Sequence, residues 1–288
     1  MENKPSKAIA QITIGIDNTS DLGEDLYKKY NLQVIYFGVV IGSELFIDKH
    51  VTPDDIYKAV EKDGILPKTN AALEMDYKEL FIKATANGGS IIHFSMSDKM
   101  SISHQNALRA AKGMERVHVI NTKSACAGTG ILAIKASELR DQGKTVEEIL
   151  ETIKPMVDKL NVGFIIKDLN YLYRGGRASG LKLLGANLLK IRPSLIVNKE
   201  GKIVPDKKFK GQFESTVKEW TQFKIEQASN ANKELAFVVH SDIDDSIVTG
   251  VINSLKGAGF KDVGRIVVGT ALTIHVGRNA LGVIFMEN

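Results

Sequence analysis

Hydroxyl side chains and one histidine occur where the sequence predicts that strands end or helices begin. Open α/β sheets bind their ligands at the ends of strands. A helix start also offers unpaired N–H groups and the positive end of the helix dipole, which together stabilise a carboxylate or a phosphate. The segments that carry these side chains are DNTSD (17–21), PKTNAA (67–72), SMSDKMSISH (95–104) and TIHVG (273–277). They indicate a site for an anionic head group.

Two of these segments also have a purely structural interpretation. Ser97, Ser101 and Ser103 precede an expected helix, where serine is an ordinary N-cap residue. Helix capping and binding of an anionic head group can fall to different serines. His275 lies in an apolar run that predicts a terminal core strand, with Thr273, His275 and the glycine at 277 on one face. A histidine there either points at a ligand or is a core residue satisfied by backbone groups.

Composition narrows the class of protein. Apolar residues make up 43% of the 288 residues, aromatic residues 7% and charged residues 25%, which is typical of a globular protein. No window approaches the roughly 20 apolar residues that span a bilayer, and the first residues do not resemble a signal peptide, so we expect a cytoplasmic protein without stable membrane insertion. The net charge of +4 and the short basic stretch 207–210 are too weak to predict nucleic-acid binding.

Several sharper chemistries lack their sequence signals. The single cysteine, Cys126, and six histidines without an HExxH pattern predict no metal site and no cofactor. The nearest match to a phosphate loop places Leu181 where lysine is required, and the glycines of GTGILA (128–133) lie too far from the preceding strand for dinucleotide binding, so they are expected to pack a helix. No GxSxG elbow is present, although a convergent Ser/His/Asp site stays open because such triads are defined by geometry.

Strands and helices alternate in the first half of the chain. This order predicts a mostly parallel sheet with helices on both faces. The expected strands are 11–17, 32–41, 90–97 and 116–122, and the expected helices include 52–64, 75–88, 101–114 and 130–143.

After an expected helix at 145–160 the pattern changes to closely spaced strands. NKEG (198–201) between two apolar runs predicts a hairpin and antiparallel pairing. We therefore expect an α/β fold of two domains, with a mostly parallel N-terminal domain at 1–157 and an α+β C-terminal domain at 158–288.

The most specific stretch of the sequence is LNYLYRGGRASG (169–180), followed by LLGANLLKIRPSLIVNKEGKI (183–203). Further characteristic segments are IDNTSDL (16–22), PKTNAA, SDKMSISHQNA (97–107) and TIHVGRNALGV (273–283). Together they resemble the DegV family of bacterial fatty-acid-binding proteins, whose better understood members are the acyl-carrying subunits of fatty acid kinase. The resemblance covers essentially the whole chain.

The resemblance implies a set of site residues. The fatty-acid carboxylate is expected to meet Thr69, Ser97, Ser101 and His275. The residues expected to shape the site are Asp98, Gly175, Gly176, Arg177 and Gly277. The chain departs from the family pattern at Asn70, Asp98, Ile102, Arg278 and Asn279, which leaves the exact ligand and the kinase pairing open. An ionised Asp98 beside the head group would repel a carboxylate.

By this resemblance the protein is a lipid-binding carrier with no catalytic residue of its own. It would hold a long-chain fatty acid in an apolar tunnel between its two halves and present the carboxylate to a separate ATP-dependent kinase. Two alternatives remain: a hydrolase or acyltransferase that uses His275 with Ser97 or Ser101 on a lipid-like ester, and a DNA-associated role for the basic loop 207–210.

Overall fold

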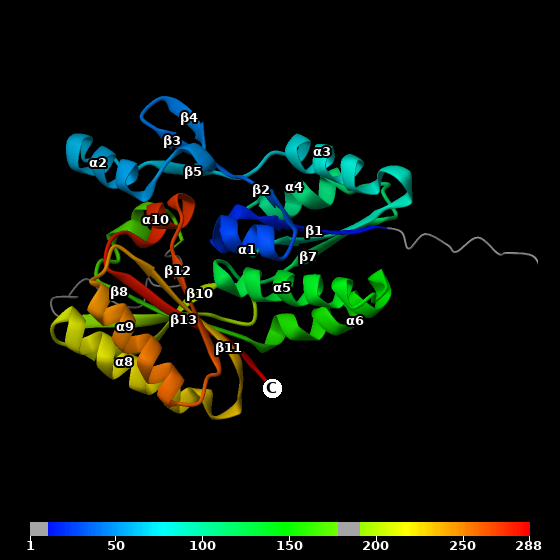
Figure 1. The fold of residues 1–288 in the computed structure, drawn as a ribbon. Helices are drawn as coiled ribbons and strands as arrows, with labels where there is room; N and C mark the ends of the chain where they lie inside the picture. Colours follow the sequence, from blue (N-terminus) through cyan, green and yellow to red (C-terminus); the bar gives the residue numbers. More distant parts are fainter. Residues whose placement is uncertain (1–10, 178–190) are drawn as a thin grey trace, which may run out of the picture.

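The computed structural model describes residues 11–177 and 191–288, and its fold contains two large sheets (Figure 1). In the first sheet every strand pair is parallel, and the strand order is β2-β1-β6-β7. The strands are β1 (Ile12–Asp17), β2 (Leu32–Ile35), β6 (Ser90–Ser95) and β7 (Val117–Asn121). All six residues of β6 are buried, because helices cover both faces of this sheet. The parallel N-terminal sheet expected from the sequence is confirmed.

The second sheet has the order β10-β9-β8-β13-β11-β12. Its strands are β8 (Leu160–Ile166), β9 (Ile191–Val197), β10 (Ile203–Lys210), β11 (Ala231–Ser241), β12 (Asp262–Val267) and β13 (Ala280–Glu287). The pairing is antiparallel, as expected, except for β11 and β12, which run parallel and are connected through helix α9 (Asp245–Gly257). The predicted hairpin at 198–201 joins β9 to β10, with Gly201 at φ +82°.

The helices form layers around and between the sheets (Figure 1). Helices α3 (Glu74–Thr85) and α4 (Ser103–Ala110) cover one face of the parallel sheet, and α5 (Ala127–Asp141) covers the other. The core around α5 also contains Val162 and Ile284 of the second sheet, so α5 lies between the two sheets. The outer face of the second sheet packs on α8 (Phe213–Gln227) and α9, around the fully buried Trp220.

Three further helices are α1 (Gly23–Lys29), α6 (Val146–Met156) and α7 (Asn170–Arg174). A Cβ on Gly130 of α5 would lie 2.5 Å from the side chain of Leu22, which agrees with the expectation that the GTGILA glycines pack a helix.

The division into domains at residue 157 stays a prediction.

The apolar run 32–41 was expected to be one strand, and this expectation is wrong. The run is split between β2 and β3 (Gly38–Ile41), which belongs to a separate antiparallel sheet with β4 (Glu44–Ile47) and β5 (Lys68–Asn70). The chain leaves the parallel sheet at Phe37, whose N–H donates to Asn18 Oδ1 at 2.9 Å. Helix α2 (Pro53–Asp63) lies between β4 and β5 in the sequence and is capped by Thr52 and Asp55, as its sequence predicts.

The terminal run around His275 also differs from the expectation. Residues Thr270–Val276 form helix α10 rather than a strand, and the final strand begins only at Ala280. Many apolar and β-branched residues made this run look extended, but Gly277 has φ +67°, which ends the helix in a conformation that L-residues rarely adopt. Thr273, His275 and Gly277 therefore do not share the face of a strand. Helical spacing instead places His275 on the same side as Ala271 and Leu272.

Candidate ligand-binding site

A cavity of about 360 Å³ lies between the second sheet, α10 and the loops that follow the parallel strands. Val162 and Phe164 of β8 pair with Ile284 and Gly282 of β13, so alternation places all four on the same face of the sheet. These four residues line the cavity, together with apolar residues of neighbouring elements. Further lining side chains include Phe37, Met96, Met100, Val197, Ile203, Val239, Leu272 and Val276. The site is thus a predominantly apolar space.

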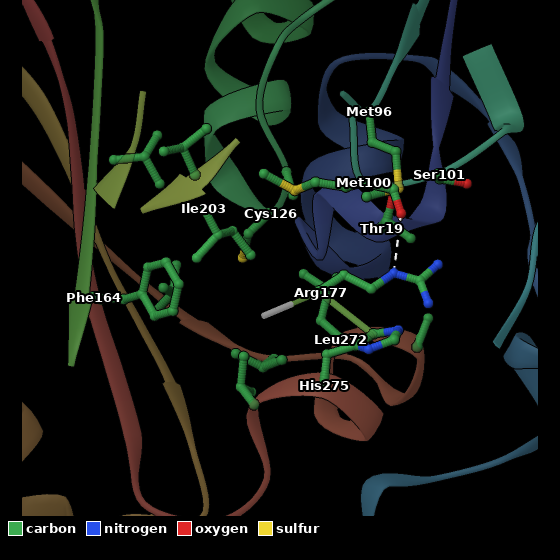
Figure 2. Close-up of a pocket in the computed structure, with 18 of the residues that line it drawn as sticks. Thr19, Met96, Met100, Ser101, Cys126, Phe164, Arg177, Ile203, Leu272 and His275 are labelled. Atoms are coloured by element: carbon green, nitrogen blue, oxygen red, sulfur yellow. Dashed lines mark hydrogen bonds between the residues drawn. The ribbon is translucent and has the colours of Figure 1, made fainter. Parts of the chain in front are cut away.

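Polar groups gather on one side of this cavity (Figure 2). Thr69 Oγ1 lies 3.1 Å from His275 Nε2, although the two residues are 206 positions apart in the sequence. Thr69 is fixed by its place in β5, where it pairs with Val39 of β3, and His275 is fixed by α10. The structure therefore brings together two of the four residues that were expected to bind a carboxylate.

The environment of His275 keeps its ring neutral. Burial, together with the smaller effect of the positive charge of Arg177, lowers the pKa of His275 to about 3. One ring nitrogen of a neutral imidazole is a donor and the other is an acceptor. Nδ1 has no hydrogen-bond partner within the described part of the chain. The ring can therefore exchange its bond to Thr69 for one to a ligand without first losing a proton.

Gly175 makes room for this ring. A Cβ at position 175 would lie 2.3 Å from His275 Nδ1 and 2.9 Å from the carbonyl oxygen of Tyr171. Gly176 follows in the left-handed conformation (φ +74°), and the N–H groups of Gly176 and Arg177 bond to the carbonyls of Tyr173 and Leu172 at the end of α7. This is the glycine-dependent Schellman ending, which turns the chain back toward the cavity.

Arg177 places a guanidinium in the cavity wall. Its Nε donates to the carbonyl of Met100 at 3.1 Å, and another guanidinium nitrogen donates to the carbonyl of Gly175 at 2.7 Å. Burial lowers the pKa of Arg177, but a guanidinium stays protonated at neutral pH. A fixed positive charge beside His275 favours an anionic group at this end (Figure 2). Gly277 lies outside the cavity lining and packs against the ring of Tyr171, from which a Cβ at position 277 would lie only 2.5 Å.

The two expected serines have different surroundings. Ser101 lines the cavity, and its Oγ accepts a bond from the N–H of Ser103 at 3.1 Å. Ser97 is fully buried outside the cavity lining, and its Oγ donates to the carbonyl of Gly201 at 2.7 Å. Ser97 thus fastens the β9–β10 hairpin to the loop after β6. Ser97 therefore has a structural contact, whereas Ser101 lines the cavity and its hydroxyl also accepts a backbone N–H at the start of α4.

Asp98 also lies outside the cavity lining. Its carboxylate pairs with Lys99 Nζ at 2.9 Å. Partial burial raises the pKa of Asp98, but hydrogen bonds from Lys99 and Asn121 outweigh it, so the net pKa lies below the ordinary value. The anticipated repulsion between Asp98 and a head group therefore does not follow from this arrangement.

The other departures from the family pattern fall into two groups. Asn70 and Ile102 line the cavity, whereas the side chain of Arg278 points to Asp242 and Glu61 and lies 3.9 Å from the centroid of the Tyr57 ring. Asn279 has φ +54°, a conformation that asparagine tolerates better than most residues. Part of the most specific sequence stretch, residues 178–190, lies outside the described residues.

Around His275 the described residues do not form the nucleophile, base and acid of a serine hydrolase. His275 Nε2 is paired with a threonine, and within residues 11–177 and 191–288 no acidic side chain orients Nδ1. The same residues contain no group of three or more His, Cys, Asp or Glu side chains placed to hold a metal ion. None of the described helices combines the length and apolar character required to cross a membrane.

Sequence reasoning missed most of the cavity wall. Phe164 and Ile203 looked like ordinary core residues of strands, and no local signal distinguishes a side chain that faces a cavity from one that faces a packed core. Thr19 also lines the cavity, and its segment DNTSD was noticed for its hydroxyl groups without being assigned to the site. The available signal for Thr19 was its position directly after the first parallel strand, where open α/β sheets bind ligands.

Comparison with known proteins supports this fold. Residues 11–288 match the sequence model of a protein family, which is described as uncharacterised proteins of the DegV family. A DegV domain-containing protein of Clostridium perfringens is 26% identical over 287 residues, which cover 96% of this chain and 97% of its own.

Two solved structures show the same architecture. One, described as showing fatty acid binding of a DegV family protein from Thermus thermophilus, has a TM-score of 0.89 at 23% identity and covers 96% of this chain and 100% of its own. The other is a DegV lipid-binding protein from Thermotoga maritima, with a TM-score of 0.83 at 25% identity, covering 96% of this chain and 99% of its own. The expected α/β fold is confirmed.

The close contact at Gly175 generates a prediction. In Gly175→Ala the new methyl group must displace the ring of His275 or the backbone of Tyr171, so we expect a loss of about 1–3 kcal/mol in the free energy of unfolding, measured by urea denaturation. Gly250→Ala in α9 is the matched control, because a Cβ there meets nothing within 4 Å and alanine favours the helix. A Gly175→Ala protein as stable as the control would contradict the packing described.

The lowered pKa of His275 generates a prediction about pH. Because the folded pKa (about 3) lies below the ordinary value of 6.5, the unfolded chain binds more protons between these limits, and stability is lost as the pH falls through that window. His275→Gln should reduce the slope of unfolding free energy against pH between about pH 4 and 6, by up to ~1.4 kcal/mol per pH unit. The exposed His50→Gln is the control and should follow the wild type. Equal slopes for all three proteins would show that His275 is not buried as described.

Proposed function

This chain belongs to the DegV family, and from that premise we propose that it binds a long-chain fatty acid as a carrier. The observation that carries the proposal is an apolar cavity with a threonine–histidine pair and an arginine on one side. Such a space matches an amphipathic ligand with one anionic end and a long apolar tail. The fatty acid and lipid binding described for the Thermus thermophilus and Thermotoga maritima proteins supports the same ligand class.

The tail supplies most of the proposed affinity. About 15 methylenes at ~0.8 kcal/mol each give a gross driving force of ~12 kcal/mol before the costs of ordering the ligand. The cavity volume of about 360 Å³ falls within the range of ~300–1,000 Å³ that is typical of small-molecule sites. The side chains of Phe164 and Ile203 lie on the side away from His275, which is where the tail would extend (Figure 2).

The carboxylate would occupy the polar end. In the proposed complex Thr69 and Ser101 donate their hydroxyl hydrogens, neutral His275 donates a ring N–H, and Arg177 contributes a fixed positive charge. A negative charge beside His275 raises the pKa of the ring, so binding the carboxylate would offset part of the effect of burial. Ser97, which bonds to Gly201, acts in this proposal as a support rather than as a ligand contact.

We further propose that the bound acid is handed to a separate ATP-dependent kinase, which would phosphorylate the carboxylate. The resemblance to acyl-carrying subunits of fatty acid kinase supports this step. A carrier of this kind requires no cofactor and no catalytic group of its own. The proposed division at residue 157 would make the cavity a site between two domains, where ligand sites are common.

Titration with palmitate tests the head-group assignment. Thr69→Val and His275→Ala each remove a donor to a charged group, so we expect each to weaken binding by about tenfold in a fluorescence displacement assay. His50→Ala, an exposed histidine outside the cavity, should bind as the wild type does. Wild-type affinity in both site variants would reject these contacts, and turnover of an acyl ester that depends on Ser101 would favour a hydrolase instead.

A further inference from the structure

Thr19 is a buried side chain of the cavity wall whose hydroxyl has no partner among residues 11–177 and 191–288. It is 1% exposed and lines the cavity. Its Oγ1 makes no hydrogen bond within the described residues. Buried hydroxyl groups in native proteins almost always have a partner, so each exception requires an explanation.

The backbone around Thr19 is held firmly in place. Thr19 belongs to a short 3-10 turn (Asn18–Ser20) that directly follows β1, and its carbonyl accepts the N–H of Cys126 at 2.8 Å. The side chain of Asn18 bonds to the N–H of Phe37 and to the carboxylate of Asp48. These bonds fix the backbone on both sides of Thr19, so a shift of the turn does not readily bring the hydroxyl to another partner.

The position of Thr19 selects one end of the cavity. Phe37 and Cys126, which flank it through these bonds, also line the cavity. In Figure 2 Thr19 is drawn on the side of the cavity where Ser101 and Arg177 lie, and well apart from Phe164 and Ile203. The unpartnered hydroxyl therefore belongs to the polar end rather than to the tail end.

We propose that the Thr19 hydroxyl is a further hydrogen-bond donor to the carboxylate of the bound ligand. This inference rests on the proposed function, because it requires a ligand with an anionic head group in the cavity. In the complex the carboxylate accepts from Thr19 in the turn after β1, from Thr69 in β5 and from His275 in α10. The hydroxyl thus gains a partner that the described residues do not provide, and it selects a carboxylate over a head group without acceptors.

A pair of substitutions separates the hydroxyl from the shape of the side chain. Thr19→Val keeps the shape and removes the hydroxyl, whereas Thr19→Ser keeps the hydroxyl and removes a methyl group. We expect Thr19→Val to bind palmitate about tenfold more weakly and Thr19→Ser to bind within about twofold of the wild type. Thr221→Val is the matched control, because Thr221 bonds to the carbonyl of Val217 in α8, outside the cavity lining, and should leave affinity unchanged.

Stability gives a second readout. Since the Thr19 hydroxyl has no partner in the described part of the chain, the ligand-free Thr19→Val protein should melt no lower than the wild type, whereas a structural role would lower its melting temperature. Equal palmitate affinity in wild type and Thr19→Val, or a loss in Thr19→Ser as large as that in Thr19→Val, would overturn the inference. Failure of the wild type itself to bind palmitate would instead reject the proposed function.

Discussion

A hydrogen bond between Thr69 and His275 lies at the polar end of a predominantly apolar cavity, and separate parts of the fold hold these two side chains in place. Thr69 depends on the small antiparallel sheet, which exists because the chain leaves the parallel sheet at Phe37. His275 is held by α10, and the position of its ring requires a glycine at 175. Two distant segments thus converge on one polar contact.

Burial favours ligand binding by the apolar residues of the site but is unfavourable for its polar groups. It keeps His275 neutral and lets the apolar wall bind an apolar tail, but each hydroxyl buried without a hydrogen-bond partner costs free energy. A carboxylate with an apolar tail resolves both conditions, because the tail fills the space between the sheets and the head group supplies acceptors. The fixed charge of Arg177 compensates for the solvation that the carboxylate would lose.

The sequence predicted the features that arise from local patterns. The buried strands β1 and β6, the capped helix α2 and the hairpin closed by Gly201 follow from periodicity, capping residues and turn residues close together in the chain. Thr69 and His275 were identified through resemblance, because nothing local shows that residues so far apart will meet.

The errors have a common physical origin. Helix α10 has the β-branched composition of a strand, and its identity depends on packing against α2 and α7 and on the ending at Gly277. The separation of β2 from β3 depends on the bond between Asn18 and Phe37, which tertiary structure creates. Likewise, the bond of Ser97 to Gly201 of the hairpin is a tertiary contact, which the sequence around Ser97 and Ser101 does not reveal.

The central claim is that the purified protein carries a fatty acid in this cavity. Native mass spectrometry, followed by organic extraction and identification of the released compound, tests it most directly. We expect a species heavier than the 31.5 kDa chain by the mass of one fatty acid, and a smaller fraction of that species in His275→Ala, whose affinity is expected to be about tenfold lower. An unliganded wild-type protein that also fails to take up added palmitate would contradict it.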